Sequence, residues 1–142
     1  MKRKASAVWH GDLKSGKGAI STESGALAQT QYSFSTRFEN GVGTNPEELI
    51  AAAHAGCFTM ALTFALSSAG HPPESIETTA TLTLENLPEK SWTVTAIHLD
   101  TTAKVPGVAA DAFAQFAAGA KANCPISRLL NTTITLDAKL AG

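Results

Sequence analysis

The longest hydrophobic stretch of the chain predicts one long helix. Asn45 is a good N-cap residue, Pro46 fits the first helical position, and Glu48 can complete a capping box. Apart from one internal glycine, helix breakers return only at Gly70 and the two prolines that follow it closely. The pattern therefore predicts a helix over about residues 46 to 69 that is roughly 36 Å long.

This predicted helix is apolar on every side, which is typical of a helix that is buried on every side. A membrane span is the alternative, but a histidine, threonines and many small residues lower its hydrophobicity, and no basic residues flank it. One domain of 142 residues has difficulty covering both sides of such a rod. We therefore expect no membrane partner and a second copy of the chain as cover. The large apolar residues are Leu49, Ile50, Cys57, Phe58, Met60, Leu62, Phe64 and Leu66.

Alternation of apolar and polar residues predicts six strands around this helix. In the third strand, aromatic residues alternate with polar ones, and Arg37 lies on the polar face near the end. In the fifth strand the alternation slips by one position, which predicts a β-bulge. A second helix is expected from Asp111 to Asn123, and a short one begins at Pro125. The expected strands cover residues 4–9, 18–22, 31–38, 76–85, 92–102 and 134–140.

The elements follow the order βββ-α-ββ-α-β with short connections, which is typical of an α+β domain with largely antiparallel sheets. We expect a single domain over residues 1–142. The chain is 44% hydrophobic and 16% charged with a net charge of -1, which fits a soluble globular domain and offers no basic surface for nucleic acid. The basic residues 2–4 are not followed by the hydrophobic region of a signal peptide, so we expect a cytoplasmic protein.

The two cysteines are not expected to form a structural disulfide in a reducing compartment, so they are either inert core thiols or a working redox pair. Cys57 lies in the middle of the predicted helix, where apolar burial raises a thiol pKa and the helix dipole gives little help. Cys124 lies at the predicted N-cap before Pro125, where free backbone N–H groups favour a thiolate. Cys124 therefore suits a resolving thiol, and a small buried hydrophobic residue is the alternative.

A thiolate at Cys57 needs a cation from elsewhere in the chain. Arg37 is the candidate because it ends a strand just before the helix; a solvated surface arginine is the alternative. Glu47 is explained by the helix dipole, or it pairs with Arg37 and orients the guanidinium. Glu47 and Cys57 are about 15 Å apart along the axis, so one site containing all three residues would take Glu47, alone or together with Arg37, from a partner subunit. Arg128 is the next candidate cation.

These residues allow a peroxidase mechanism without a cofactor. The Cys57 thiolate attacks a peroxide O–O bond and becomes a sulfenic acid, and Cys124 condenses with it to a disulfide that an outside dithiol reduces. Arg37 would stabilise the thiolate and then the leaving alkoxide. Phe58 and Met60, in the apolar surroundings of the thiol, would favour organic hydroperoxides over hydrogen peroxide.

Two other classes stay open from the residues alone. His54 shares a helical face with Cys57, so the pair could form a cysteine hydrolase in which Cys124 is dispensable; a hydrogen-bonded core histidine is the alternative. A thiol redox sensor or binding module would become oxidised without turnover. The remaining histidines show no ligand spacing, so we predict no metal site.

Five short motifs spread over essentially the whole chain resemble those of the OsmC/Ohr family of osmotically inducible and organic hydroperoxide resistance proteins. The two motifs around the cysteines, in this order and spacing, carry most of the resemblance. The motifs are Trp9-His10-Gly11-Asp12, Ser21-Thr22-Glu23-Ser24-Gly25, Thr36-Arg37-Phe38-Glu39, Gly43-Thr44-Asn45-Pro46-Glu47-Glu48-Leu49 with Ala53-His54-Ala55-Gly56-Cys57-Phe58, and Asn123-Cys124-Pro125-Ile126-Ser127.

The resemblance implies a thiol-dependent peroxidase with peroxidatic Cys57 and resolving Cys124. It implies an intertwined homodimer in which the sheets wrap around two long central helices. Glu47 matches the glutamate of the family's Asn-Pro-Glu motif, and the absence of an arginine between Arg3 and Arg37 favours the OsmC branch with Arg37 in the site. Lipoyl-bearing proteins reduce Ohr members, which makes such a protein a candidate external dithiol.

Overall fold

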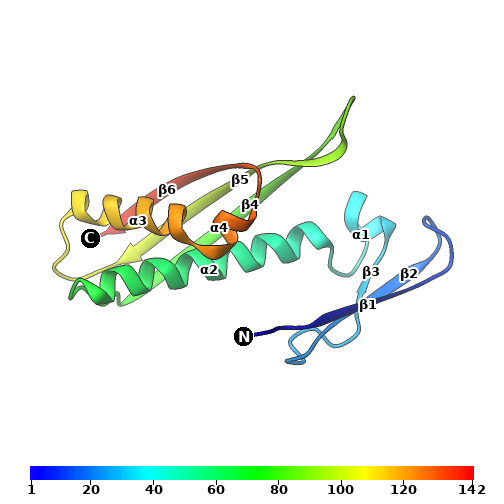
Figure 1. The fold of residues 1–142 in the computed structure, drawn as a ribbon, viewed down its shortest axis with the longest axis horizontal. Helices are drawn as coiled ribbons and strands as arrows, with labels where there is room; N and C mark the ends of the chain where they lie inside the picture. Colours follow the sequence, from blue (N-terminus) through cyan, green and yellow to red (C-terminus); the bar gives the residue numbers. More distant parts are fainter. The chain divides into compact units, whose positions relative to one another are not determined.

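The computed structural model describes residues 1–142, which fold into two compact units, Met1–Leu49 and Ile50–Gly142. Each unit contains its own three-stranded sheet (Figure 1). The α+β class with a long helix is confirmed, and the expectation of one domain stays a prediction. In chain order the elements are β1 (Ala5–His10), β2 (Lys17–Thr22), β3 (Thr30–Tyr32), α1 (Phe34–Phe38), α2 (Pro46–Ser68), β4 (Ser75–Leu87), β5 (Ser91–Lys104), α3 (Ala110–Asn123), α4 (Pro125–Leu129) and β6 (Thr133–Ala141).

The sheet of the first unit is an antiparallel meander in the order β1-β2-β3. Gly18 is opposite Trp9 on β1 and Tyr32 on β3. The rings of these two aromatic residues lie 5.5 Å apart, and a Cβ at Gly18 would collide with the tyrosine ring. Glycine is therefore required here because two rings close over the backbone.

The third predicted strand is wrong beyond Tyr32, because residues 34–38 form the single-turn helix α1. Ser33 caps this helix: its hydroxyl accepts from the Thr36 N–H at 3.3 Å, and the Thr36 hydroxyl accepts from the Ser33 N–H at 2.8 Å. This local capping box competes with strand pairing. The aromatic residues that imitate a strand pattern instead pack one helical turn apart with tilted rings, and the ring centroids of Phe34 and Phe38 lie 4.9 Å apart. Arg37 consequently lies on a helix.

The ends of α2 agree with the prediction to within one residue. At the start, the Asn45 side chain accepts from the Glu48 N–H at 2.8 Å, as an N-cap does. The Glu48 carboxylate does not complete the capping box and accepts from the Thr44 hydroxyl at 2.8 Å. At the other end Gly70 has a φ of 84°, and the His71 N–H reaches back to the Leu66 carbonyl at 2.9 Å. This left-handed glycine terminates the helix.

The sheet of the second unit has the order β4-β5-β6. β4 and β5 form a long antiparallel hairpin whose register shifts where Thr83 and Leu84 face Ala96 and Val94, which confirms the predicted bulge. β6 runs parallel to β5, because α3 and α4 carry the chain back across the sheet before β6 begins. Three of the four strand pairings are antiparallel, in line with the prediction.

The core of the second unit forms where α2 and α3 pack against β5. Residues at every fourth position of α2 face inward: His54, Phe58, Leu62 and Leu66 are fully buried. They meet residues of β5 and α3, and the core set comprises Phe58, Leu62, Leu66, Ile97, Leu99, Ala103, Val105, Phe113, Ala117, Ala120 and Cys124. One stripe of α2 therefore fixes the helix in this unit.

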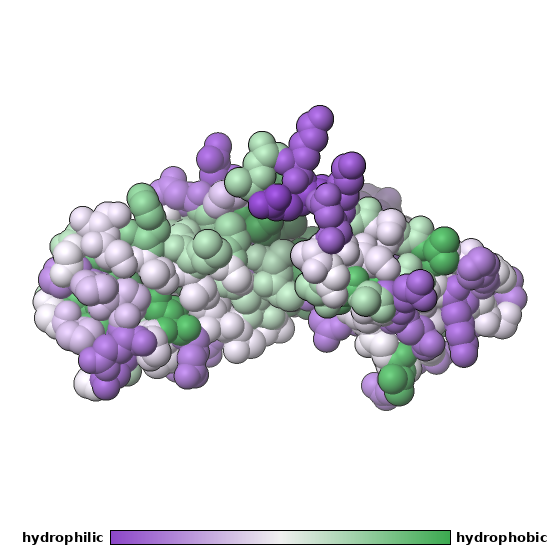
Figure 2. Space-filling view, turned by 90° about the horizontal axis from the view of Figure 1, so that it is seen from below, coloured by the Kyte–Doolittle hydropathy of each residue, from purple (hydrophilic) through white to green (hydrophobic).

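The predicted burial of α2 on every side is not met within one chain. The side chains of Met60 and Phe64 are each 75% exposed. Seen from below in Figure 2, the surface over the second unit has a broad white and pale-green area between hydrophilic residues at its edges. By length and composition alone α2 is apolar enough to cross a membrane, and 22% of its most apolar window is buried inside the chain.

Candidate functional site

The two cysteines lie side by side in the second unit. Cys57 is near the middle of α2, and Cys124 is the residue at which α3 ends and α4 begins. The Cys124 thiol donates a hydrogen bond to the Cys57 sulfur at 2.8 Å, and both thiols are free. Because a disulfide bond is about 2.05 Å long, a movement of less than an ångström would allow a bond. Cys57 is partly exposed and Cys124 is fully buried.

Two effects oppose each other at the Cys57 sulfur. Burial raises the pKa of the Cys57 thiol, and the neighbouring Cys124 acts in the same direction. A hydrogen bond from the Ile126 backbone N–H lowers it, but the net direction is upward. Arg128, the second candidate cation, is an exposed residue in the last turn of α4 and has no part in this balance. The second unit therefore provides no cation for the thiolate, and the expected requirement for an outside cation stands.

The predicted environment of Cys124 is wrong. Its side chain makes no capping hydrogen bond to α4, although it occupies the N-cap position. The buried side chain faces Cys57, and the α4 N–H that contacts a sulfur, that of Ile126, contacts the sulfur of Cys57. The prediction that N–H groups at the start of α4 contact a thiol was correct, but the thiol is Cys57 and not Cys124. The sequence does not show the direction of the Cys124 side chain, which decides between the two.

His54 is a buried core histidine that contacts α4. Its Nε2 lies 2.8 Å from the hydroxyl of Ser127, and its Nδ1 has no hydrogen-bond partner. Neither ring nitrogen bonds to Cys57, so the hydrolase alternative, in which His54 is the base, lacks its central contact. Sequence reasoning missed Ser127, although its position three residues after Cys124 was a signal, since that spacing places it on the same side of a helix.

In the first unit, Arg37 and Glu47 form the predicted pair. The Arg37 Nη2 donates to Glu47 Oε1 at 2.6 Å, and Nε lies 3.1 Å from both carboxylate oxygens. The guanidinium also lies over the Phe38 ring, 5.2 Å from its centroid. Asn45 contributes to this geometry because its side chain donates to the Thr36 carbonyl at 3.1 Å, which links α1 to the start of α2. Short local contacts thus hold the guanidinium in a defined orientation.

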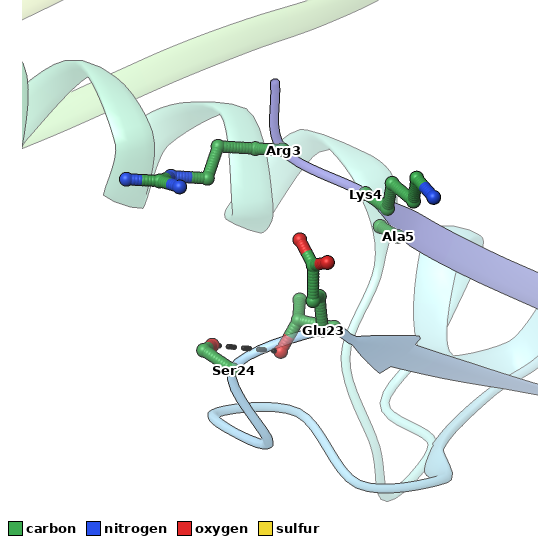
Figure 3. Close-up of a pocket in the computed structure, with 6 residues that line it drawn as sticks. Arg3, Lys4, Ala5, Glu23 and Ser24 are labelled. Atoms are coloured by element: carbon green, nitrogen blue, oxygen red, sulfur yellow. Dashed lines mark hydrogen bonds between the residues drawn. The ribbon is translucent and has the colours of Figure 1, made fainter. Parts of the chain in front are cut away.

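An aromatic pocket of about 350 Å³ lies beside this ion pair in the first unit, and sequence reasoning did not find it. Its wall is lined by Trp9, Leu13, Tyr32, Ser33, Phe34, Arg37, Phe38 and Pro46. A second hollow of about 510 Å³ is lined by residues of both charges: Arg3, Lys4, Ala5, Thr22, Glu23 and Ser24 (Figure 3). The aromatic pocket is the better match for an apolar molecule that also contacts a guanidinium.

The two predicted substrate-binding residues lie in different environments. The side chain of Phe58 is completely buried in the core of the second unit, and its role stays a prediction. Met60 is largely exposed on α2, and its role stays a prediction. The sequence could not show that Phe58 is buried and Met60 exposed, because a helix that is apolar on every side gives no sign of which face a single chain covers.

Comparison with known proteins identifies the class. Two facing thiols on an α+β scaffold are the arrangement of a thiol-based redox protein. Residues 38–139 match the family model described as OsmC-like protein. Peroxiredoxin OsmC of Escherichia coli K12 is 50% identical over 138 residues, which cover 97% of this chain and 96% of the relative. The chain therefore belongs to the OsmC family, and the predicted enzyme class, a peroxidase, is confirmed.

Solved structures share the fold at much lower identity. An OsmC-like protein of unknown function from Vibrio cholerae has a TM-score of 0.79 and 16% identity, with 97% of this chain and 99% of that chain covered. The organic hydroperoxide resistance protein OhrB of Bacillus subtilis has a TM-score of 0.68 and 19% identity, with 97% and 98% covered. At these identities the likeness concerns the fold alone.

Replacing His54 with glutamine should reduce the loss of stability in mild acid. Burial holds the pKa of His54 below its ordinary value of about 6.5, so the unfolded chain binds a proton in mild acid that the folded chain does not. Stability present above about pH 6.5 is therefore lost as the pH falls towards the lower folded value, by up to about 1.4 kcal/mol per unit.

Urea denaturation between about pH 7.5 and 5.5 measures this dependence. His10→Gln, at an exposed position, is the matched control and should retain the wild-type profile. An identical pH profile in wild type and His54→Gln would show that His54 is not the group responsible.

Proposed function

We propose that this OsmC-family peroxidase reduces organic hydroperoxides to alcohols through Cys57 and Cys124. The observation that carries the proposal is the 2.8 Å separation of the two sulfurs, which come from distant parts of the sequence. The relative at 50% identity is a peroxiredoxin, which supports a hydroperoxide substrate. OhrB, which shares the fold at 19% identity, is an organic hydroperoxide resistance protein, so an organic hydroperoxide is the first substrate to test.

In the proposed cycle the Cys57 thiolate attacks the terminal peroxide oxygen. The S–O bond forms as the O–O bond breaks, and the leaving alkoxide takes a proton to give the alcohol. The Cys124 sulfur then displaces hydroxide from the Cys57 sulfenic acid, which gives a disulfide and water. An external dithiol attacks the disulfide and leaves as its own disulfide, so both thiols return. A lipoyl-bearing protein is one candidate for this dithiol.

Arg37 is the proposed source of positive charge. The raised pKa of Cys57 leaves little thiolate at neutral pH unless a cation is brought to the sulfur. Glu47 bonds to Nε and Nη2 of Arg37, which leaves Nη1 available for the sulfur or the peroxide. In this role Glu47 orients the guanidinium, and Arg37 stabilises first the thiolate and then the developing alkoxide.

A homodimer is the proposed working form, with a cytoplasmic location. The exposed face of α2, with Met60 and Phe64, is apolar and unpartnered within the chain. A second copy supplies cover of the same chemistry, whereas hydrophilic residues border the area on the visible face in Figure 2. Association through α2 also gives a route by which Arg37 and Glu47 of one subunit serve Cys57 of the other.

The two cysteines should separate the steps of the cycle. One equivalent of cumene hydroperoxide should convert the reduced wild type to a disulfide, seen as loss of two hydrogens by mass spectrometry. Cys124→Ser should stop at a Cys57 sulfenic acid, which dimedone traps, and Cys57→Ser should not react. Multiple turnovers with a dithiol should occur in the wild type alone. A wild type whose mass does not respond to the peroxide would eliminate the proposed chemistry.

Replacing Arg37 with alanine should slow peroxide attack by about two orders of magnitude, because the variant lacks the charge that stabilises the transition state. Arg128→Ala is the matched control, since this exposed arginine has no ion pair, and it should react at the wild-type rate. Stopped-flow measurement of thiol loss with cumene hydroperoxide compares them. If Arg37→Ala reacts at the wild-type rate, Arg37 is not the source of the stabilising positive charge. If Arg128→Ala loses reactivity, Arg128 contributes that charge.

Replacing Met60 or Phe64 with aspartate should weaken the dimer, because each change buries a charge in an apolar interface. Ala114→Asp, at an exposed position on α3, is the matched control and should leave assembly unchanged. Light scattering after size-exclusion chromatography gives the mass of each species. A monomeric wild type, or α2 variants that remain fully dimeric, would contradict association through this face.

A further inference from the structure

The buried stripe of α2 contains one polar residue, His54, among apolar ones. A histidine there costs stability, since its Nδ1 is buried with no partner. Leucine or phenylalanine would serve packing better, so packing alone does not explain the residue. Its one hydrogen bond, Nε2 to the Ser127 hydroxyl at 2.8 Å, is the interaction that an apolar residue could not make.

This hydrogen bond lies beside the thiol pair. His54 and Cys57 are three residues apart on α2, and Ser127 and Cys124 are three residues apart at the start of α4. The two contacts therefore run in parallel between the same two segments, with His54 on Ser127 and Cys57 on Cys124. Between them the Ile126 N–H also contacts the Cys57 sulfur. A shift of α4 along α2 would change all three contacts together.

The proton of the neutral imidazole is assigned to Nε2. A buried N–H without an acceptor is rarer and more costly than an unpaired lone pair, so the partnerless Nδ1 is the unprotonated nitrogen. Nε2–H then donates to the Ser127 hydroxyl oxygen. The His54–Ser127 hydrogen bond holds α4 through the Ser127 side chain, whereas the Cys57–Cys124 contact must be free to change during the proposed reaction.

We infer that His54 and Ser127 are a positioning pair that holds α4 in register on α2, so that Cys124 reaches the oxidised Cys57 sulfur. The inference rests on the proposed function and concerns its second step. Neither residue touches the peroxide in this role. Without the pair, α4 can shift away from α2, and the Cys57 sulfenic acid has a longer lifetime before Cys124 reacts with it. Excess peroxide then oxidises more of the sulfenic acid to the sulfinic acid.

The test measures disulfide formation directly after one fast equivalent of cumene hydroperoxide. Ser127→Ala and His54→Leu should form the disulfide about tenfold more slowly than wild type, the factor expected for one lost buried hydrogen bond. More dimedone-trapped sulfenic acid should accumulate, with more sulfinic acid under excess peroxide. Ser127→Thr retains the hydroxyl and His54→Gln retains an N–H donor at a similar distance, so both should recover much of the rate.

Thr101→Val is the matched control. It removes another buried hydroxyl, one that hydrogen-bonds Thr78 and the Glu77 carbonyl and makes no hydrogen bond to α4. It should form the disulfide at the wild-type rate. Thermal denaturation separates positioning from folding: His54→Leu should be at least as stable as wild type and still slow, which a merely structural role would not produce.

Failure of the proposed function can be distinguished from failure of the positioning role. If the wild type forms no disulfide, the proposed function fails. If the wild type forms it and both Ser127→Ala and His54→Leu form it equally fast, the peroxidase stands and the positioning role is overturned. A rate loss in Ser127→Ala that Ser127→Thr restores, with Thr101→Val unaffected, supports the positioning pair even if His54→Leu does not fold.

Discussion

The contact between α4 and α2 is the constraint on which the thiol chemistry depends. Cys57 is fixed by a long helix whose inward stripe is packed into the core, and this sulfur therefore has little freedom. Cys124 belongs to the junction of two helices, where the chain turns sharply. The junction brings a thiol and a backbone N–H to the same sulfur, so once peroxide has oxidised Cys57 in the proposed cycle, a small rotation of the junction would bring Cys124 within disulfide distance.

Electrostatics gives the two units different tasks. The apolar core holds Cys57 well but raises its pKa, which opposes the reactive form. The first unit holds a guanidinium whose orientation is set by Glu47 and the Phe38 ring. An unpaired cation is costly to bury in an apolar core. In the proposed mechanism the positive charge would therefore come from Arg37, which lies outside the core that holds the thiol.

Much of the fold follows from the sequence because long elements repeat their signals. The ends of α2 are marked by Asn45, Pro46 and Gly70, and the bulge in β5 is visible as a slip in alternation. Helix α1 was missed because its aromatic residues alternate as they do in a strand. The capping box formed by two side chains stabilises a five-residue helix there instead. Short segments have too few residues for a pattern to outweigh one local hydrogen-bond pair.

The site was predictable where it depends on charge and less so where it depends on side-chain direction. Arg37 on α1 and Glu47 in the first turn of α2 carry opposite charges, and the sequence offered their pairing as one of two explanations for Glu47. The contact of His54 with Ser127 and the orientation of Cys124 depend on rotamers set by packing across the core, which no spacing rule contains. Phe58 illustrates the same limit, because the buried stripe of a uniformly apolar helix is chosen by its partners.

The exposed apolar face of α2 is best understood together with the site. A helix with one buried stripe and an exposed apolar face on the other side is what one subunit would contribute to the interface of the proposed dimer. A membrane could cover that face, but the same helix fixes Cys57 beside Cys124 and a polar His54–Ser127 pair in a packed protein core. In the proposed dimer, a second chain would cover this face with apolar surface of the same kind and would also bring its own Arg37–Glu47 pair, whereas lipid would offer hydrocarbon alone.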